Sequence, residues 1–514
     1  MPQLAVWVDA VDVTVGEREP DGVAADEMGV VDGRLGAEED RRCSSDAVFT
    51  AVGAWTRCPQ AAARQRGGHP IAPLDGEPFG VDSDSFGCVL HARNGTSGSI
   101  VTDMAVPELH IRPGNPDFLD LPWDLPILEW DDPHVVEMPT GIHRHPVIFV
   151  AYPDGVYAIK ELPVRLARHE FKTLRKLAKR TTRSAIPAGL IIRPWADPHD
   201  EYSGAIITRF VDYAFPYREL VSGGGFGSRR AQLLDAFAGL LVELHLSGCF
   251  WGDCSLSNVL YRYDAATIEA VMVDAETSRL YDELSIGQRE EDLEIMTVNL
   301  AGDMSDIAVS QGYDLDAADL EIGLDISDRY AALWNELTTD LLIAEDERFR
   351  IRERVLRLNS LGFSVADVDV IPEGESHRIR ISVSVGSRTF HSQRLRELTG
   401  IDAADNQARQ ILSDMRYHRA KHGQPYDPDS PTARTVSAMN WRINRFEPFT
   451  ARIADLRPDS DPIQGFCDYL NFRFAIASDR GWDMDSKLAF EEWIGAGMPG
   501  FDPAITFPEL GSLQ

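Results

Sequence analysis

Three short segments of the chain carry residue types that could together transfer a phosphoryl group. Lys160 lies inside an apolar run, and Asp253 is followed five positions later by Asn258. A second apolar run ends at Asp274 and Glu276. A lysine neutralises phosphates, carboxylate and amide oxygens suit Mg²⁺, and a carboxylate can orient a hydroxyl and accept its proton. This order of residues predicts phosphoryl transfer from a nucleotide to a hydroxyl group.

The acidic and amide residues of this set have separate expected roles. We expect Asp253 to be the catalytic carboxylate, and Asn258 and Asp274 to be ligands of Mg²⁺. Glu276 follows Asp274 by two positions, so in an extended segment both point to the same side, and Glu276 can help to hold the metal ion or a water molecule. Each residue taken alone would more often be a surface group, and only the ordered set indicates chemistry.

Lys160 is expected to bind the phosphates of ATP, and for this it needs an anionic partner. Glu170, on the helix that follows, is the expected partner. Glu161 is the weaker candidate, because neighbouring residues of a strand point to opposite faces. Taken alone, Glu170 could also be a solvated helix residue. We place Lys160 and Glu170 with Asp253 in the catalytic group.

The loop between the first two expected strands occupies the place of a phosphate-binding, glycine-rich loop, yet it contains a single glycine, Gly141. Arg144, or His143 and His145 in the same loop, either contact phosphate directly or are ordinary polar loop residues, and the sequence leaves both alternatives open. In the strand expected at residues 205–210, Ile207 and Arg209 are expected to line the same cofactor site. The expected cofactors are ATP and Mg²⁺.

These residues need a scaffold, and the hydrophobic pattern predicts strands mainly in the first half of the chain and helices in the second. Strands are expected at residues 135–138, 147–152, 156–162 and 205–210, with helices at 165–179 and 231–246. Beyond residue 281 we expect mainly helices, interrupted by one β-hairpin of residues 364–370 and 377–385. The pattern is typical of an α+β protein.

Composition excludes several classes of protein. The chain has 514 residues, a net charge of -32 and 44% hydrophobic residues, which indicates a globular chain long enough for two to four domains. Nucleic-acid binding is disfavoured, because phosphate backbones are held by surplus lysine and arginine. The six cysteines form no C-x-x-C pair, and no apolar run is long enough to span a membrane. We therefore expect a cytoplasmic protein with reduced thiols.

The N-terminal region differs from the rest. Residues 1–103 show no sustained helical or strand period, so we expect them to be poorly structured. One hypothesis is that they do not belong to the natural protein and that translation starts at Met104. Residues 104–134 contain an apolar segment broken by prolines, and we expect them to wrap as an arm around the following domain.

Four segments carry a resemblance to a known family. They begin with Arg112-Pro113-Gly114-Asn115-Pro116, Tyr157-Ala158-Ile159-Lys160, Trp251-Gly252-Asp253 and Thr399-Gly400-Ile401. Residues 135–276 resemble the lipopolysaccharide-kinase-like (Kdo/WaaP, InaA-type) branch of the protein-kinase-like superfamily. The longer region 109–493 looks like a family of bacterial proteins that join such a domain to a C-terminal domain of unknown function.

The resemblance implies a two-lobed, protein-kinase-like α+β fold with ATP and Mg²⁺ between the lobes, followed by a mainly helical C-terminal domain with a small β-hairpin. The implied kinase-like core covers residues 135–280, with an N-lobe to about residue 212 and a C-lobe from about residue 213. Residues 281–500 would form the C-terminal domain, and part of this region would complete the C-lobe. The implied activity is ATP- and Mg²⁺-dependent phosphorylation of a hydroxyl on a small molecule, sugar or lipid-linked glycan.

The chain departs from protein kinases at the position of the histidine that supports the catalytic loop, which is Trp251, and in the residues Ala275-Glu276 that follow Asp274. Two alternatives therefore stay open. The first is a nucleotide-binding pseudokinase or regulatory scaffold, whose C-terminal domain binds a protein partner. The second is a protein nucleotidyl transferase. The sequence contains no pattern that identifies the phosphate acceptor, because acceptor specificity resides in loops.

Overall fold

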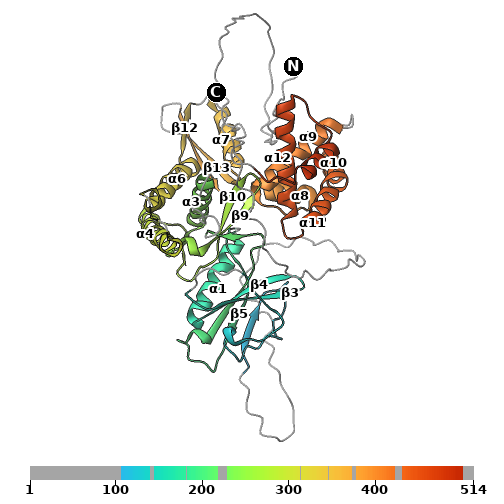
Figure 1. Ribbon diagram of the computed structural model, residues 1–514. Helices are drawn as coiled ribbons and strands as arrows, with labels where there is room; N and C mark the ends of the chain where they lie inside the picture. The colour runs from blue at the N-terminus through green and yellow to red at the C-terminus, as the bar shows by residue number, and fades with distance from the viewer. Residues whose placement is uncertain are drawn as a thin grey trace, which may run out of the picture. The chain divides into compact units, whose positions relative to one another are not determined.

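The computed structural model describes residues 106–501, apart from 139–143, 181, 218–228, 313, 316, 345–346, 373–377 and 423–430. The segment 1–103, Met104 and Gly141 lie outside the described residues. Within the described part, a β-rich region is followed by mainly helical ones, which confirms the expected α+β class (Figure 1).

The first region is built on a six-stranded antiparallel sheet with the order β1-β5-β6-β4-β3-β2. Its strands are β1 (Glu108–Ile111), β2 (Val135–Val136), β3 (Val147–Tyr152), β4 (Gly155–Leu162), β5 (Ile186–Ile192) and β6 (Gly204–Arg209). The sequence predicted β2, β3, β4 and β6 but not β1 or β5. The two missed strands pair with each other at one edge, so the sheet is wider than expected.

Both faces of this sheet are covered. Side chains alternate along β4, so Tyr157 and Ile159 enter one apolar cluster and Leu162 enters another. Helix α1 (Val164–Lys179) covers the Leu162 face with its buried side chains, among them Leu174. The sheet therefore places Lys160, which shares a face with Leu162, on the side of α1.

The segment 118–130 packs on the opposite face of the sheet. Phe118, Trp123 and Trp130 join the cluster that contains Tyr157 and Ile159. A short 3₁₀ helix, η1 (Ile127–Glu129), ends this arm. The arm therefore closes the outer face of the sheet with aromatic side chains.

The second region is helical and packs around α3 (Arg230–Leu246), which is buried along most of its length. Helices α4 (Ile286–Gln311) and α6 (Ile322–Thr338) contribute to the same core, as does the hairpin of β9 (Val259–Asp264) and β10 (Thr267–Met272). Because α3 is apolar and buried around most of its circumference, other elements must pack against it on every side. Residues beyond 281 thus complete this lobe.

Shorter elements fill the connections between these parts. They are η2 (Glu201–Ser203), β7 (Phe215–Pro216), β8 (Cys249–Phe250), η4 (Leu256–Asn258), β11 (Arg279–Leu280), α5 (Ala317–Leu320) and α7 (Phe349–Ser360). The expected β-hairpin is present as β13 (Val365–Pro372) and β14 (Arg378–Val385), but β12 (Leu341–Ala344) extends it to a three-stranded sheet. Helix α6 ends at Thr338, and β12 follows it where the expectation was mainly helical.

The last part is a helical bundle with its own aromatic core. Its elements are α8 (Phe390–Thr399), α9 (Asp405–His422), α10 (Pro431–Trp441), the π-helical turn η6 (Arg442–Phe446), α11 (Glu447–Leu456), α12 (Pro462–Arg480) and α13 (Ser486–Gly495). Trp441, Phe466 and Trp493 are fully buried in this core. Among the described helices, none combines the length and apolar character that a membrane span requires.

Candidate active site

Lys160 lies among three carboxylates. Its Nζ is 2.9 Å from Oε2 of Glu170, 2.8 Å from Oδ2 of Asp274 and 3.8 Å from Oε2 of Glu276. Strand β4 holds the lysine in register opposite Ile206 of β6. Glu170 of α1 and the carboxylates of Asp274 and Glu276, all selected from the sequence, are thus brought together around one ammonium group.

Glu170 is the partner that the sequence analysis preferred, and it is 1% exposed. Burial raises the pKa of its carboxyl group to about 7, although the charge of Lys160 opposes this shift. Its Oε1 also accepts a hydrogen bond of 3.4 Å from the backbone N–H of Ala275. Glu170 therefore links α1 both to Lys160 and to the segment that follows Asp274.

The charges of Lys160 and Asp274 stabilise each other. Burial alone would lower the pKa of Lys160, but Glu170 and Asp274 outweigh it, and the pKa is raised above its usual value. Burial would raise the pKa of Asp274, but Lys160 outweighs it, and the pKa of this carboxyl is lowered. Both groups are therefore charged at neutral pH.

Asp253 is held by two amides. Its Oδ2 accepts a hydrogen bond of 3.1 Å from Nδ2 of Asn258, and its Oδ1 accepts one of 3.0 Å from Nδ2 of Asn299. Nδ2 of Asn258 also donates to the backbone oxygen of Asp253, at 3.0 Å. Burial raises the pKa of Asp253 and the two amides lower it. The carboxylate is thus fixed in orientation, as a group that must orient a hydroxyl would need to be.

Helix α4 supports the loop that carries Asp253. The buried carboxylate of Asp292 accepts backbone hydrogen bonds from Trp251 at 2.7 Å and Gly252 at 2.8 Å. Asp303 accepts another from Leu256, at 2.7 Å. Asp292, Asn299 and Asp303 are spaced seven and four positions apart, which places them along one face of the helix. This row of side chains fixes the loop from one side.

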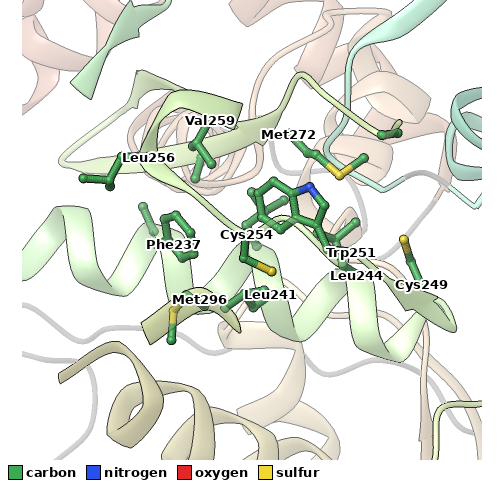
Figure 2. Close-up of a cluster of buried hydrophobic side chains, with 14 of the residues drawn as sticks. Phe237, Leu241, Leu244, Cys249, Trp251, Cys254, Leu256, Val259, Met272 and Met296 are labelled. Carbon is green, nitrogen blue, oxygen red and sulfur yellow. The ribbon is translucent and has the colours of Figure 1, made fainter. Parts of the chain in front are cut away.

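Apolar packing fixes the same loop from beneath. Figure 2 shows the indole of Trp251 and the side chain of Cys254 among apolar groups of α3 and its neighbours. Trp251 is fully buried, and its Nε1 donates a hydrogen bond of 3.1 Å to the backbone oxygen of Asp274. The residue in place of the expected histidine therefore connects the loop that carries Asp253 to the segment of Asp274.

His145 follows the loop expected to cover the phosphates. Its side chain is buried, with Nε2 located 3.0 Å from Oε2 of Glu276 and Nδ1 located 3.3 Å from Oε1 of Glu201. His145 contributes most to lowering the pKa of Glu276. Arg144 is exposed, and no contact with Lys160 or Asp253 is found for it among the described residues. Of the two described residues Arg144 and His145, it is thus His145 that contacts the site.

Two residues expected to line the cofactor site lie on the other face of the sheet. Ile206 is directly opposite Lys160, so Ile207 points the other way and is fully buried beneath the arm. Arg209 shares the face of Ile207 and donates a hydrogen bond of 2.8 Å to the backbone oxygen of Asp154. The expectation of cofactor contacts from Ile207 and Arg209 is therefore corrected.

The donor set fits Mg²⁺, but it is not arranged around an ion. Asp274, Glu276 and the side-chain oxygen of Asn258 are hard oxygen donors. Within the described ranges, no group of three or more Asp, Glu, His or Cys side chains is placed to hold a metal ion. Asp274 and Glu276 are instead occupied by Lys160 and His145. Metal binding would require these contacts to open.

Asn299, Asp292 and Asp303 were not predicted from the sequence. The three α4 residues are far from the loop in sequence, and only their common helical face, at positions i, i+7 and i+11, could have indicated a shared function. His145 was considered from the sequence as a phosphate contact or an ordinary polar loop residue, and its contact with Glu276 could not be predicted because it depends on the fold.

Fold and site together define a protein-kinase-like domain. Its features are an antiparallel β-lobe with a lysine paired to a helix glutamate, a helical lobe with an Asp-x4-Asn loop, and an aspartate after the next hairpin. Residues 332–498 match the family described as Domain of unknown function (DUF4032). The chain thus joins a kinase-like fold to a C-terminal region similar to that family.

Similar solved structures include one described as WaaP in complex with acyl carrier protein and one of the Rad53 kinase domain and SCD2. The first is 16% identical, covers 38% of this chain and 78% of the other, and has a TM-score of 0.28. The second is 14% identical, covers 37% and 70%, and has a TM-score of 0.22. Because these TM-scores are low, the protein-kinase-like fold is assigned from the strand order and the site geometry. No curated protein sequence matched the chain.

Proposed function

We propose that this protein is an ATP- and Mg²⁺-dependent phosphotransferase that acts on a hydroxyl of a small molecule, sugar or lipid-linked glycan. The observation that carries the proposal is the ion pair of Lys160 with the buried Glu170, next to Asp274. This ion pair supports phosphate binding by Lys160, because it holds the ammonium group in place against a carboxylate that is 1% exposed.

Each side chain would contribute one step. Lys160 binds the α- and β-phosphates. Asn258 and Asp274 would hold Mg²⁺, which would neutralise charge on the phosphates. Asp253 orients the acceptor hydroxyl and accepts its proton as the acceptor oxygen bonds to the γ-phosphorus. The bond from the γ-phosphorus to the bridging oxygen breaks, and ADP leaves. Asn299 and Asn258 keep Asp253 oriented throughout.

A second candidate is a nucleotide-binding regulator that transfers no phosphate. It is favoured by the direct contact of 2.8 Å between Lys160 and Asp274, because a metal ligand engaged by a lysine is not free to hold Mg²⁺. The two candidates differ in what Asp253 does. In the regulator, Asp253 would have no chemical role.

Phosphorus NMR of the full chain with Mg²⁺, ATP and pools of sugars, amino alcohols or lipid-linked glycans tests the proposal. We expect a phosphomonoester and ADP, with a rate lowered by about 10² to 10⁴ in Asp253→Asn. Asp455→Asn, an exposed change on α11, is the matched control and should leave the rate unchanged. ATP binding without any phosphoester would favour the regulator, and nucleotide attached to protein would favour nucleotidyl transfer.

A further inference from the structure

The hairpin β9–β10 connects the candidate active site with the helical bundle. Asn258 immediately precedes β9, and Asp274 follows β10 by two residues. The strands pair without interruption from Val259↔Met272 to Asp264↔Thr267. The backbone N–H of Val273 donates a further hydrogen bond of 3.0 Å to the oxygen of Asn258. Both expected metal ligands of these segments therefore lie at one end of a continuous ladder.

The other end of the hairpin is bound by α9. The carboxylate of Asp264, which is 1% exposed, accepts hydrogen bonds from the backbone N–H groups of Asn406 at 3.1 Å and Gln407 at 2.7 Å. It also accepts one of 2.9 Å from Nδ2 of Asn406. The first turn of a helix has unpaired N–H groups and a partial positive charge, so this carboxylate acts as a cap supplied by another domain.

The side chain of Gln464 on α12 forms hydrogen bonds with both backbone groups of Ala265, the next residue of the turn. Ala265 has φ of 55°, and its backbone N–H donates to Oε1 of Gln464 at 2.9 Å. Nε2 of Gln464 donates to the backbone oxygen of Ala265, also at 2.9 Å. The methyl group of Ala265 belongs to the apolar core of the bundle. The turn of the kinase-like lobe is thus built into the C-terminal domain.

We propose that the C-terminal bundle positions the metal-binding residues of the candidate active site by holding the turn of this hairpin. The inference rests on the proposed function, and it makes Asp264 and Gln464 positioning residues. Strand β7 pairs with β9 through two residues, Phe215↔Tyr261 and Pro216↔Leu260. A two-stranded hairpin is marginally stable in water by itself and this third strand is short, so the order of the hairpin also depends on what holds its ends and faces. Holding the turn suppresses fraying of the ladder, and the ladder keeps Asn258 and Asp274 at a fixed separation.

Hydrogen exchange of the full chain tests this, with Gln464→Leu as the variant. Loss of the two hydrogen bonds to Ala265, each contributing about 1 kcal/mol, should speed exchange of the Val273 N–H about tenfold or more through easier opening of the hairpin. The variant also loses the hydrogen bonds of Gln464 with Gln407 and Asp468. Gln410→Leu is the matched control: Gln410 joins α9 to α12 through Cys467 and Asn471 without touching the hairpin. It should leave exchange at Val273 unchanged.

The possible outcomes distinguish coupling through the hairpin from a local effect of the substitution. Gln464→Glu keeps the acceptor for the Ala265 N–H but loses the donor, so it should give an intermediate rate, and it carries the comparison if Gln464→Leu fails to fold. Faster exchange confined to the turn, or equal acceleration by Gln410→Leu, would overturn the proposal. A parallel titration with Mg²⁺ and ATP should show weaker binding in Gln464→Leu. If the wild type binds no nucleotide, the proposed function fails, while the exchange data still decide the coupling.

Discussion

Lys160 has two carboxylate partners that titrate very differently. The pKa of Asp274 is lowered, whereas burial raises the pKa of Glu170 to about 7. Around neutral pH the carboxylate of Asp274 beside Lys160 therefore stays charged, whereas Glu170 gains or loses its charge. Because the folded-state pKa of Glu170 lies above its usual value of 4.5, its protonation stabilises the fold at low pH, and this contribution is lost as the pH rises through about 7.

Carbon NMR of the Glu170 carboxyl group, assigned with Glu170→Gln, should show a titration midpoint near pH 7. Lys160→Met should move the midpoint to higher pH, because Lys160 is the largest influence that lowers the pKa of Glu170. A midpoint that stays the same in Lys160→Met would contradict the ion pair.

Asn299 supplies one of the two amides that hold Asp253. Asn299→Leu has a similar volume but donates no hydrogen bond, so it should raise the pKa of Asp253 and slow any phosphoryl transfer. The Asp253 carboxyl signal can be followed by NMR against pH, which needs no substrate. Val298→Ala, at the exposed neighbouring position of α4, serves as the control. An unchanged pKa in Asn299→Leu would show that the amide does not influence Asp253.

At the scale of elements, the arm of residues 118–130 is fixed to the β-lobe by a buried ion pair. Arg193, which is 1% exposed, donates to Glu161 at 2.8 Å and, through Nε, to the backbone oxygen of Trp123 at 2.7 Å. The other carboxylate oxygen of Glu161 accepts from the backbone N–H of Ile127, at 3.3 Å. Glu161, the neighbour of Lys160 on β4, thus binds the arm, whereas Lys160 lies in the candidate site.

Arg193→Leu should lower the free energy of unfolding by about 3–5 kcal/mol, because it leaves Glu161 buried without its cation. The double variant Arg193→Leu/Glu161→Leu should recover part of this loss, since neither charge then remains. Urea denaturation of the full chain measures both. If Glu161→Leu destabilises the Arg193→Leu variant as much as it destabilises the wild type, the two residues are not coupled.

At the scale of the whole molecule, the sequence predicted the residues that local spacing defines. Lys160, Asp253, Asn258 and Asp274 each belong to a short pattern of apolar run and polar residue, and such patterns can be read without the fold. Glu170 required one further step, the helix that follows the strand. These five residues are found together in the structure, although their chemical roles stay predictions.

What the sequence did not predict depends on tertiary packing. The face of β6 could not be assigned, because alternation gives two sets of residues but not which set meets Lys160, and Ile207 was therefore placed wrongly. Strand β5 contains Pro187 and Gly189, both poor strand formers, and its pairing shifts register between them. The contacts of Asn299 and Gln464 join segments distant in the chain, and no local pattern announces them.

The central claim is that Lys160 and Asp274 belong to a site for Mg²⁺ and ATP. Thermal denaturation of the full chain with both ligands, compared between wild type and Asp274→Ala, tests it most directly, with Asp455→Ala as the control. At about 100 times the dissociation constant, ligand should add about 2.7 kcal/mol of stability. We predict a Mg²⁺-dependent rise of several degrees in Tm for wild type and Asp455→Ala, and none for Asp274→Ala. No rise with any nucleotide, or the same rise in Asp274→Ala, would contradict the account.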